Sequence, residues 1–288
     1  MLKSDICFLN DKSAYNTRYR ASLLSHFSRA FSVKSHGLFE IGLPLYIWAL
    51  LVQKNIVSSN LKSNLVCMAF FWRRALIILN GLGRLRSEVW FRRVLILVLK
   101  CNHRKTFAVQ NFADYRYLRL HVRTKNFYHV MGSGGVARNV GQNGHFVVSR
   151  NSKFAKVVSS INQFADQWGV NSIQVVGCDP DVVRRHGTDL LKGVGYQKQE
   201  DIFRYGKIFL QPTGYGEGFP HTLADAICSD LPCIVWHRDY VNFGLYRYAL
   251  EFQRVNGWIS FQPTQKLRDD ISADHVNAQY YNLFCLNK

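Results

Sequence analysis

The chain has 288 residues, of which 48% are apolar, so it is long enough to bury a core in one large or two smaller α/β domains. This composition excludes a disordered chain, and a net charge of +18 favours an anionic partner: nucleic acid, anionic lipid or a phosphorylated substrate. Seven cysteines without a C-x-x-C pair exclude a disulfide framework and zinc-finger spacing, which favours a reducing cytoplasm.

Residues 1–127 alternate short strand-like and helix-like segments. A strand-length apolar run at residues 5–9 precedes a polar loop and a helical pattern over residues 18–30. The runs that continue the alternation are LYIWALLV, SNLVCMAFF, ALIILNG and KTFAVQNFADYRYLRLH. We therefore predict an N-terminal α/β domain over residues 1–127, and we expect no secretion signal because the first 20 residues lack a continuous apolar core.

Two segments of this first half bear on membrane binding. The longest apolar run, residues 41–52, is too short to span a bilayer, which takes about 20 residues. It indicates a buried helix, with shallow membrane contact as the alternative. Residues 86–100, RSEVWFRRVLILVLK, mix Arg with aromatic and aliphatic side chains. That mixture is typical of a basic helix at an anionic membrane, and equally of a helix with one buried and one solvated side.

Residues 128–144 are rich in Gly and Asn and predict a linker or mobile loop between two domains. The GSGG run inside it is weak as a phosphate-binding loop and indicates flexibility instead. From residue 145 strands and helices alternate again, which predicts a parallel sheet with right-handed crossovers. We expect this C-terminal domain to extend to residue 265 and a helical tail to cover residues 266–288.

The run IFLQPTGYGEGFPHTLADAICSDLPCIVW, Ile208 to Trp236, leads a strand through a glycine-rich loop into a helix. Loops at the carboxyl ends of parallel strands bind ligands, and the unpaired N–H groups of a helix N-terminus suit a phosphate. Glu217 and Asp225, eight residues apart, are two acids that a structural turn does not need. The alternative for Glu217 is a solvated loop acid, and for Asp225 an acid favoured by the helix dipole.

This run resembles the donor-binding segment of retaining glycosyltransferases of family 4, the kind that builds bacterial surface polysaccharides. Pro212-Thr213, Glu217-Gly218-Phe219-Pro220 and Leu231-Pro232 fit the family pattern. Asp225 stands where the family has a second Glu, and Asp230 stands where it has Gly. The resemblance implies an α/β chain of the GT-B fold: two Rossmann-like domains whose parallel sheets face a central cleft.

Upstream, FVVSRNSKFAKVV is similar to the family's strand and basic pair that clamp the donor diphosphate. Arg150 fits the first cation, while Lys156 and Lys153 compete for the second, with Lys156 slightly favoured. Looser similarity covers NGLGRL at residues 80–85, FAVQNFADYRYL at residues 107–118 and VMGSGGV at residues 130–136.

The resemblance also implies roles for these residues. Glu217 would bind hydroxyls of the transferred sugar, Asp225 would accept from the ribose, and Arg150 with Lys156 would offset the charge on the leaving diphosphate. No metal is expected. The residues expected to bind the UDP- or GDP-linked donor are Asp225, Gly218, Phe219, Pro220, His221, Thr222 and Lys153.

The implied activity is hexosyl transfer to a glycan or lipid-linked acceptor in O-antigen, lipopolysaccharide or capsule-type polysaccharide biosynthesis. We expect a cytoplasmic protein, peripheral at the inner face of the plasma membrane if its basic first half meets anionic lipid. Two other hypotheses stay open. One is a basic protein that binds nucleic acid or membrane, although no nucleic-acid-binding motif accompanies the charge. The other is a degenerate transferase that only binds donor.

Overall fold

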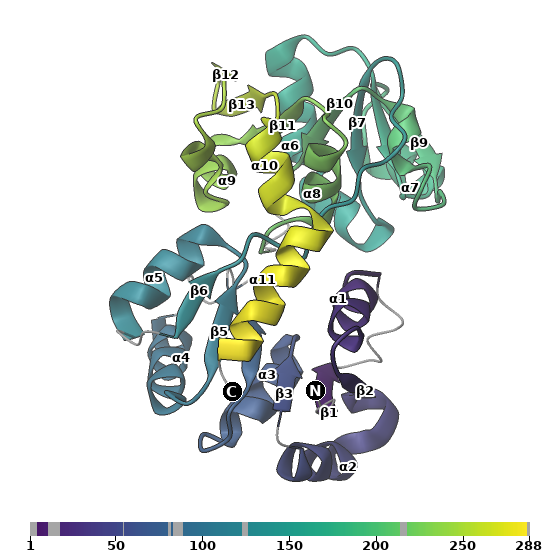
Figure 1. The fold of residues 1–288 in the computed structure, drawn as a ribbon. Helices are drawn as coiled ribbons and strands as arrows, with labels where there is room; N and C mark the ends of the chain where they lie inside the picture. The colour runs from purple at the N-terminus through teal and green to yellow at the C-terminus, as the bar shows by residue number, and fades with distance from the viewer. Residues whose placement is uncertain are drawn as a thin grey trace. The chain divides into compact units, whose positions relative to one another are not determined.

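A computed structural model describes residues 5–10, 18–53, 55–79, 82, 89–122, 126–213 and 218–286. The chain divides into two compact units, each with its own sheet (Figure 1). The first unit comprises the described residues up to Gly134, then Gly218 and Phe219, and the chain from Ala273 onward. The second comprises the described residues from Gly135 to Thr213 and from Pro220 to Ser272.

The first unit contains a six-stranded sheet in the order β2-β1-β3-β4-β5-β6, and every pair of neighbouring strands is parallel. Its strands are β1 (Asp5–Asn10), β2 (Ser32–Gly37), β3 (Asn55–Ser58), β4 (Leu76–Leu79), β5 (Thr106–Val109) and β6 (Phe127–His129). Its helices are α1 (Arg18–Ser28), α2 (Leu38–Val52), α3 (Leu61–Ala69), α4 (Val89–Cys101), α5 (Phe112–Val122) and α11 (Ala273–Leu286).

Both faces of this first sheet are covered by helices. Helices α2 to α5 pack on the face that carries Cys7 and Leu9, and α1 with α11 packs on the face that carries Ile6 and Phe8. Strands covered on both faces read as continuous apolar runs, which is why LIIL forms the fully buried β4. The alternation predicted for the first half is thereby confirmed as an α/β unit.

Helix α2 differs from the buried helix that its apolar sequence indicates. Only Tyr46, Ala49 and Leu50 are buried, at the i, i+3, i+4 spacing of one helical stripe. The opposite side, which includes Trp48, is exposed because α2 lies on the outside of the sheet. The backbone kinks at Gly42, whose φ is +76°.

The second unit contains a seven-stranded sheet in the order β12-β13-β11-β10-β7-β8-β9. Its strands are β7 (His145–Val148), β8 (Ile173–Val176), β9 (Leu191–Gly195), β10 (Ile208–Gln211), β11 (Cys233–Trp236), β12 (Phe252–Val255) and β13 (Trp258–Phe261). Its helices are α6 (Asn151–Trp168), α7 (Pro180–His186), α8 (His221–Cys228), α9 (His237–Asn242) and α10 (Gln265–Ile271), with 3₁₀ turns η3 (Ile202–Tyr205) and η4 (Leu245–Tyr248).

The sequence analysis expected a parallel second sheet, and the structure shows a sheet that is antiparallel at one edge. Strands β12 and β13 form a hairpin that pairs antiparallel with β11 at one edge. The hairpin turns at Asn256 and Gly257, whose φ angles are +46° and +91°. Asn-Gly suits such a turn because both residues tolerate positive φ, so this dipeptide is a signal that the sequence analysis missed.

The GSGG run is packed, although the sequence indicates flexibility. Residues 132–135 are all buried. A Cβ on Gly134 would lie 2.5 Å from Ala273 Cα, and one on Gly135 would lie 2.3 Å from the Ala224 carbonyl oxygen. These glycines therefore let backbone segments approach within their own units. The predicted linker, residues 128–144, begins inside β6 and contains the first passage of the chain from one unit to the other, after Gly134.

Candidate functional site

The strand order of the second sheet reverses between β7 and β10. From β7 the chain adds β8 and β9 on one side, whereas β10 and β11 follow on the other side. In open parallel sheets, ligands bind at such a reversal, outside the carboxyl ends of the two strands, because the loops there diverge. The residues that follow β7 and β10 therefore form the candidate site.

Arg150 lies at the carboxyl end of β7. It is the N-cap residue of α6, with an extended backbone (φ −114°, ψ 153°) and an exposed side chain. The preceding Ser149 donates from its N–H to the Val176 carbonyl over 3.0 Å. Asn151 Oδ1 accepts from the Asp179 N–H at 2.8 Å. These bonds join the loop after β7 to the end of β8 and to the loop that follows it, so the backbone that carries Arg150 is fixed.

Lys153 and Lys156 lie on successive turns of α6. Lys153 is in the first turn and half-buried, and Lys156 is one turn further and exposed. Side chains on a helix lean toward its N-terminus, so both extend toward the end of α6 that holds Arg150. Arg150 and both lysines thus lie within the N-cap and first two turns of α6, and the choice between the lysines stays open.

Helix α8 begins where the loop after β10 ends. Pro220 is buried at the N-cap position, and the first turn contains His221 and Thr222, both half-buried. Thr222 Oγ1 lies 3.5 Å from Gln211 Oε1, at the end of β10. The helix start predicted from the sequence is therefore found at the carboxyl edge. Glu217 lies outside the described residues, together with Gly214 and Gly216, and its role stays a prediction.

Gly218 and Phe219 pack within the first unit. The Gly218 carbonyl accepts from Asn111 Nδ2 at 3.3 Å, and the Phe219 ring is buried. A Cβ added to Gly132 would lie 3.3 Å from Phe219. Packing thus accounts for these two positions, and their contact with a donor stays a prediction.

Asp225 has partners inside the second unit that the sequence analysis did not foresee. It lies in the second turn of α8, and its Oδ1 accepts from the Val136 N–H at 2.9 Å. Its Oδ2 lies 3.5 Å from Arg138 Nε, and the two side chains are only 8% and 15% exposed. The carboxylate therefore joins the segment after Gly135 to α8. A carboxylate accepts up to about four hydrogen bonds, so the expected ribose contact is compatible with these partners and stays a prediction.

We expect Asp225→Ala to lower the free energy of unfolding by about 3 kcal/mol, because it leaves the Arg138 guanidinium and the Val136 N–H without this partner. Urea denaturation measures the change. Asp181→Ala is the control, since its ion pair with Arg184 is exposed and should cost about 0–1 kcal/mol. Equal losses in the two variants would contradict a stabilising role for Asp225. Comparing UDP with 2′-deoxy-UDP in folded Asp225→Asn tests the ribose contact separately.

Asp239 is an acid near the carboxyl ends of β10 and β11 that the sequence analysis missed. It lies in the first turn of α9, directly after β11, and is half-buried. Burial raises the pKa of Asp239, and the neighbouring Thr213 hydroxyl and Arg238 guanidinium act in the opposite direction. Thr213 follows β10, so the end of β10 and the end of β11 meet here. An acid just after an apolar strand is the signal that could have found it.

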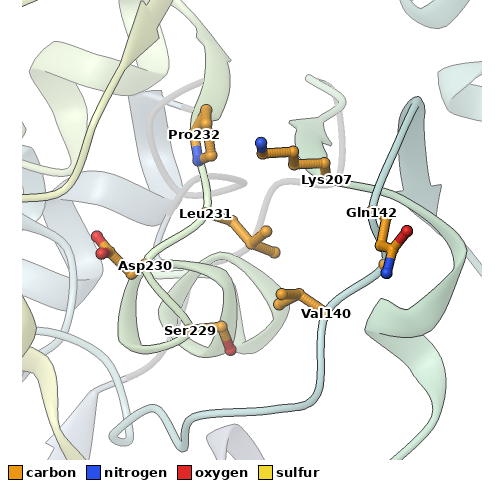
Figure 2. A pocket seen from close by; sticks show the side chains of 8 residues that line it. Val140, Gln142, Lys207, Ser229, Asp230, Leu231 and Pro232 are labelled. Atoms are coloured by element: carbon orange, nitrogen blue, oxygen red, sulfur yellow. The ribbon is translucent and has the colours of Figure 1, made fainter.

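A pocket of about 370 Å³, whose lining residues Figure 2 shows, lies at the amino ends of the strands of the second sheet, away from the candidate site. Its lining comes from residues that precede β7, β10 and β11: Val140, Gly141, Gln142, Lys207, Ser229, Asp230, Leu231 and Pro232. Asp230, which stands where the family has Gly, has a φ of +57°, a conformation that Asp tolerates. Its carboxylate accepts from Gln262 Nε2 at 3.0 Å and pairs with Arg268.

Among the residues that the structure describes, no group of three or more His, Cys, Asp or Glu side chains could hold a metal ion. Within the same residues, every helix is too short or too polar to cross a bilayer.

No protein-family model matches this sequence, and no curated protein matches it. Solved structures do match. HepE from Anabaena, in complex with UDP and glucose, is 12% identical over 79% of each chain, with a TM-score of 0.54. The GtfA/B complex is 14% identical over 84% of this chain and 59% of that chain, with a TM-score of 0.53. The UDP-GlcNAc 2-epimerase from Neisseria meningitidis, bound to UDP-GlcNAc, is 9% identical over 99% of this chain and 100% of that chain, with a TM-score of 0.50.

At these identities the similarity defines the fold. The chain has the α/β architecture of the GT-B class, with two Rossmann-like units, as the sequence resemblance implied. A 2-epimerase shares this architecture, so the fold by itself does not distinguish sugar transfer from epimerisation.

Proposed function

We propose that this chain is a glycosyltransferase that moves a sugar from a UDP- or GDP-linked donor to a glycan or lipid-linked acceptor. The observation that carries the proposal is that a group of cations and a helix N-terminus both lie at the strand-order reversal of the second sheet. Arg150 and the lysines follow β7, and the N-terminus of α8 follows β10. A donor diphosphate requires cations and unpaired N–H groups, which these two loops supply. HepE, of the same fold, was solved with UDP.

The chemistry assigned to the residues follows from the charge that develops. When the bond between the anomeric carbon and the diphosphate oxygen breaks, negative charge gathers on the diphosphate. In this proposal Arg150 and Lys156 or Lys153 stabilise that charge, with the backbone of His221 and Thr222 beside them. The proposed roles of Glu217 and Asp225 are to accept hydrogen bonds from hydroxyls of the sugar and the ribose.

The finer parts of the proposal rest on sequence resemblance. They are membership of family 4, hexosyl transfer with retention of configuration, catalysis without a metal ion, and a place in O-antigen, lipopolysaccharide or capsule-type biosynthesis. Gly218, Phe219 and Pro220 complete the proposed donor loop. Cytoplasmic location belongs to the same proposal.

A binding screen tests the proposal. Calorimetry and thermal shift with UDP, GDP, CMP and their sugars should show saturable binding of one nucleotide sugar to the wild type. We expect Glu217→Ala to lose the part of the affinity that the sugar adds and to keep the affinity for the nucleoside diphosphate. Glu200→Ala is the control, because Glu200 is an exposed acid elsewhere in the second unit. It should bind as the wild type does.

Three outcomes would contradict the proposal. A folded sample that binds none of these compounds would favour the hypothesis that the basic chain binds nucleic acid. A gel shift that persists at about 200 mM salt would support that hypothesis. Conversion of the bound donor to its 2-epimer, seen by NMR, would assign epimerisation. Binding without any turnover in the presence of candidate acceptors would support the degenerate transferase.

A further inference from the structure

The first unit carries an exposed apolar surface on the outer side of α2 and on the turn after α3. The exposed side chains are Phe39, Leu43, Leu45, Trp48, Leu51 and Val52 of α2, with Phe71 and Trp72 of the turn. We name these eight side chains the α2 surface. Trp48 and Phe39 are 62% and 60% exposed. Contiguous apolar surface of this kind on a protein marks a place where a partner binds.

The α2 surface is held by a fixed backbone. The Arg73 guanidinium donates to the Leu50 carbonyl at 3.1 Å and to the Gln53 carbonyl at 2.6 Å, at the C-terminal end of α2. The buried Lys105 Nζ donates to the Phe70 and Arg73 carbonyls at 2.8 and 3.0 Å. The turn that presents Phe71 and Trp72 is thus tied to α2 and to the interior. The eight side chains therefore form one surface.

After the exposed Glu40 in its first turn, helix α2 is apolar on its buried and on its exposed side. An ordinary surface helix is polar on the side that faces water, and a helix that is apolar all round is covered by protein or by lipid. On α2 the stripe of Tyr46, Ala49 and Leu50 faces the core, while Leu45 and Trp48 face outward. The sequence of α2 therefore fits a helix with an apolar partner on its outer side.

Cations surround the α2 surface. Lys62 Nζ lies 4.4 Å from the centre of the Phe39 ring, and Arg104 donates to the Trp72 carbonyl at 3.4 Å. Arg74 is exposed directly after Trp72 and Arg73. Between residues 38 and 74 the sequence has four Lys or Arg residues and one acid, Glu40. The partner is therefore both apolar and anionic.

We infer that the α2 surface docks on an anionic lipid bilayer. Trp and Phe favour the level of the headgroups, and Lys and Arg beside them attract anionic lipid. At 15 residues α2 is too short to cross the bilayer and would lie in its interface. A second copy of the chain fits less well, because a two-fold contact through this surface would bring the same cations together. The inference concerns a different surface from the donor site and does not depend on the proposed function.

Vesicle co-sedimentation tests the inference. We expect the wild type to bind vesicles that contain phosphatidylglycerol and to bind phosphatidylcholine vesicles weakly. Leu45→Ser with Trp48→Ser should lower the partition coefficient at least about tenfold. Leu286→Ser with Tyr196→Ser is the matched control, since it removes one aliphatic and one aromatic side chain, both highly exposed, from other elements. It should bind as the wild type does, and circular dichroism melts should show that both variants fold.

Two further measurements separate the apolar from the charged contribution. Lys62→Gln with Arg74→Gln should lower binding to anionic vesicles by about fivefold per charge and leave the weak binding to neutral vesicles unchanged. Trp48→Phe should still bind, but quenching of its tryptophan fluorescence by brominated lipid should fall. A wild type that binds no vesicle would overturn the inference, as would equal binding by all variants. Light scattering that shows a dimer broken by Leu45→Ser with Trp48→Ser would assign the surface to a second copy.

Discussion

In the proposed sugar transfer, Arg150→Ala should lower kcat about 100- to 1,000-fold. Arg150 follows the carboxyl end of β7, and its neighbours Ser149 and Asn151 are hydrogen-bonded to the last residue of β8 and to the loop after it. A cation on a fixed backbone would stabilise the proposed leaving diphosphate with little reorganisation at the moment of reaction. Arg150→Lys keeps the charge but loses the two-pronged hydrogen bonding, so its kcat should lie between those of Arg150→Ala and the wild type.

Steady-state kinetics with the donor found in the binding screen measures this effect. Arg185→Ala is the control, because Arg185 is also exposed but lies in the last turn of α7. It should leave kcat unchanged. Lys153→Ala and Lys156→Ala decide between the two lysines, since the one that completes the clamp should lower kcat as Arg150→Ala does. Arg150→Ala with an unchanged kcat would remove Arg150 from the proposed mechanism.

Gly135→Ala should lower the free energy of unfolding by about 3 kcal/mol or more. The added Cβ would lie 2.3 Å from the Ala224 carbonyl oxygen and 2.8 Å from Cys228 Sγ. The nearest neighbour is backbone of α8, which cannot move aside as a flexible side chain would. The neighbouring Val136 N–H donates to Asp225, so the same shift should also weaken that bond and the placement of α8.

Guanidinium denaturation followed by circular dichroism measures this loss of stability, and calorimetric melting gives a second, independent value. Gly169→Ala is the control: Gly169 ends α6 with a φ of +63°, and nothing lies within 4 Å of the added Cβ. It should cost about 1 kcal/mol from backbone strain alone. If Gly135→Ala were no more destabilising than Gly169→Ala, Gly135 would have the flexible role that the sequence indicates, and the close packing would be wrong.

Packing of the GSGG run changes how the second unit is understood. Gly135, Val136 and Arg138 belong to a stretch that composition alone predicts to be a linker. In the structure the Val136 N–H and the Arg138 side chain meet Asp225, and the Arg138 N–H donates to Ser229 Oγ at 2.8 Å. The stretch therefore supports α8, the helix whose N-terminus belongs to the candidate site.

Much of the fold and part of the candidate site were predictable from local sequence. The run Ile208 to Trp236 predicts a strand, a loop, a helix and a strand, and β10, α8 and β11 occupy those places. The same periodicity predicts α6, which Gly169 ends in the left-handed conformation. These predictions succeed because strand and helix periodicity depend on residues that are close in the sequence. The helix start at His221 was found in the same way, whereas Arg150 was proposed from the family resemblance.

The sequence by itself determined the α/β class, the order of most elements and the acids and cations that the donor hypothesis uses. Only the tertiary structure decided which side of α2 is buried, that Gly135 packs on α8, and that Asp225 meets Val136, 89 residues away. Local periodicity marks an apolar stripe, but α2 is apolar on every side from residue 41 to residue 52, so only packing against the sheet selects the stripe of Tyr46, Ala49 and Leu50. Contacts across such sequence separations leave no periodic signal, because they depend on how whole elements pack.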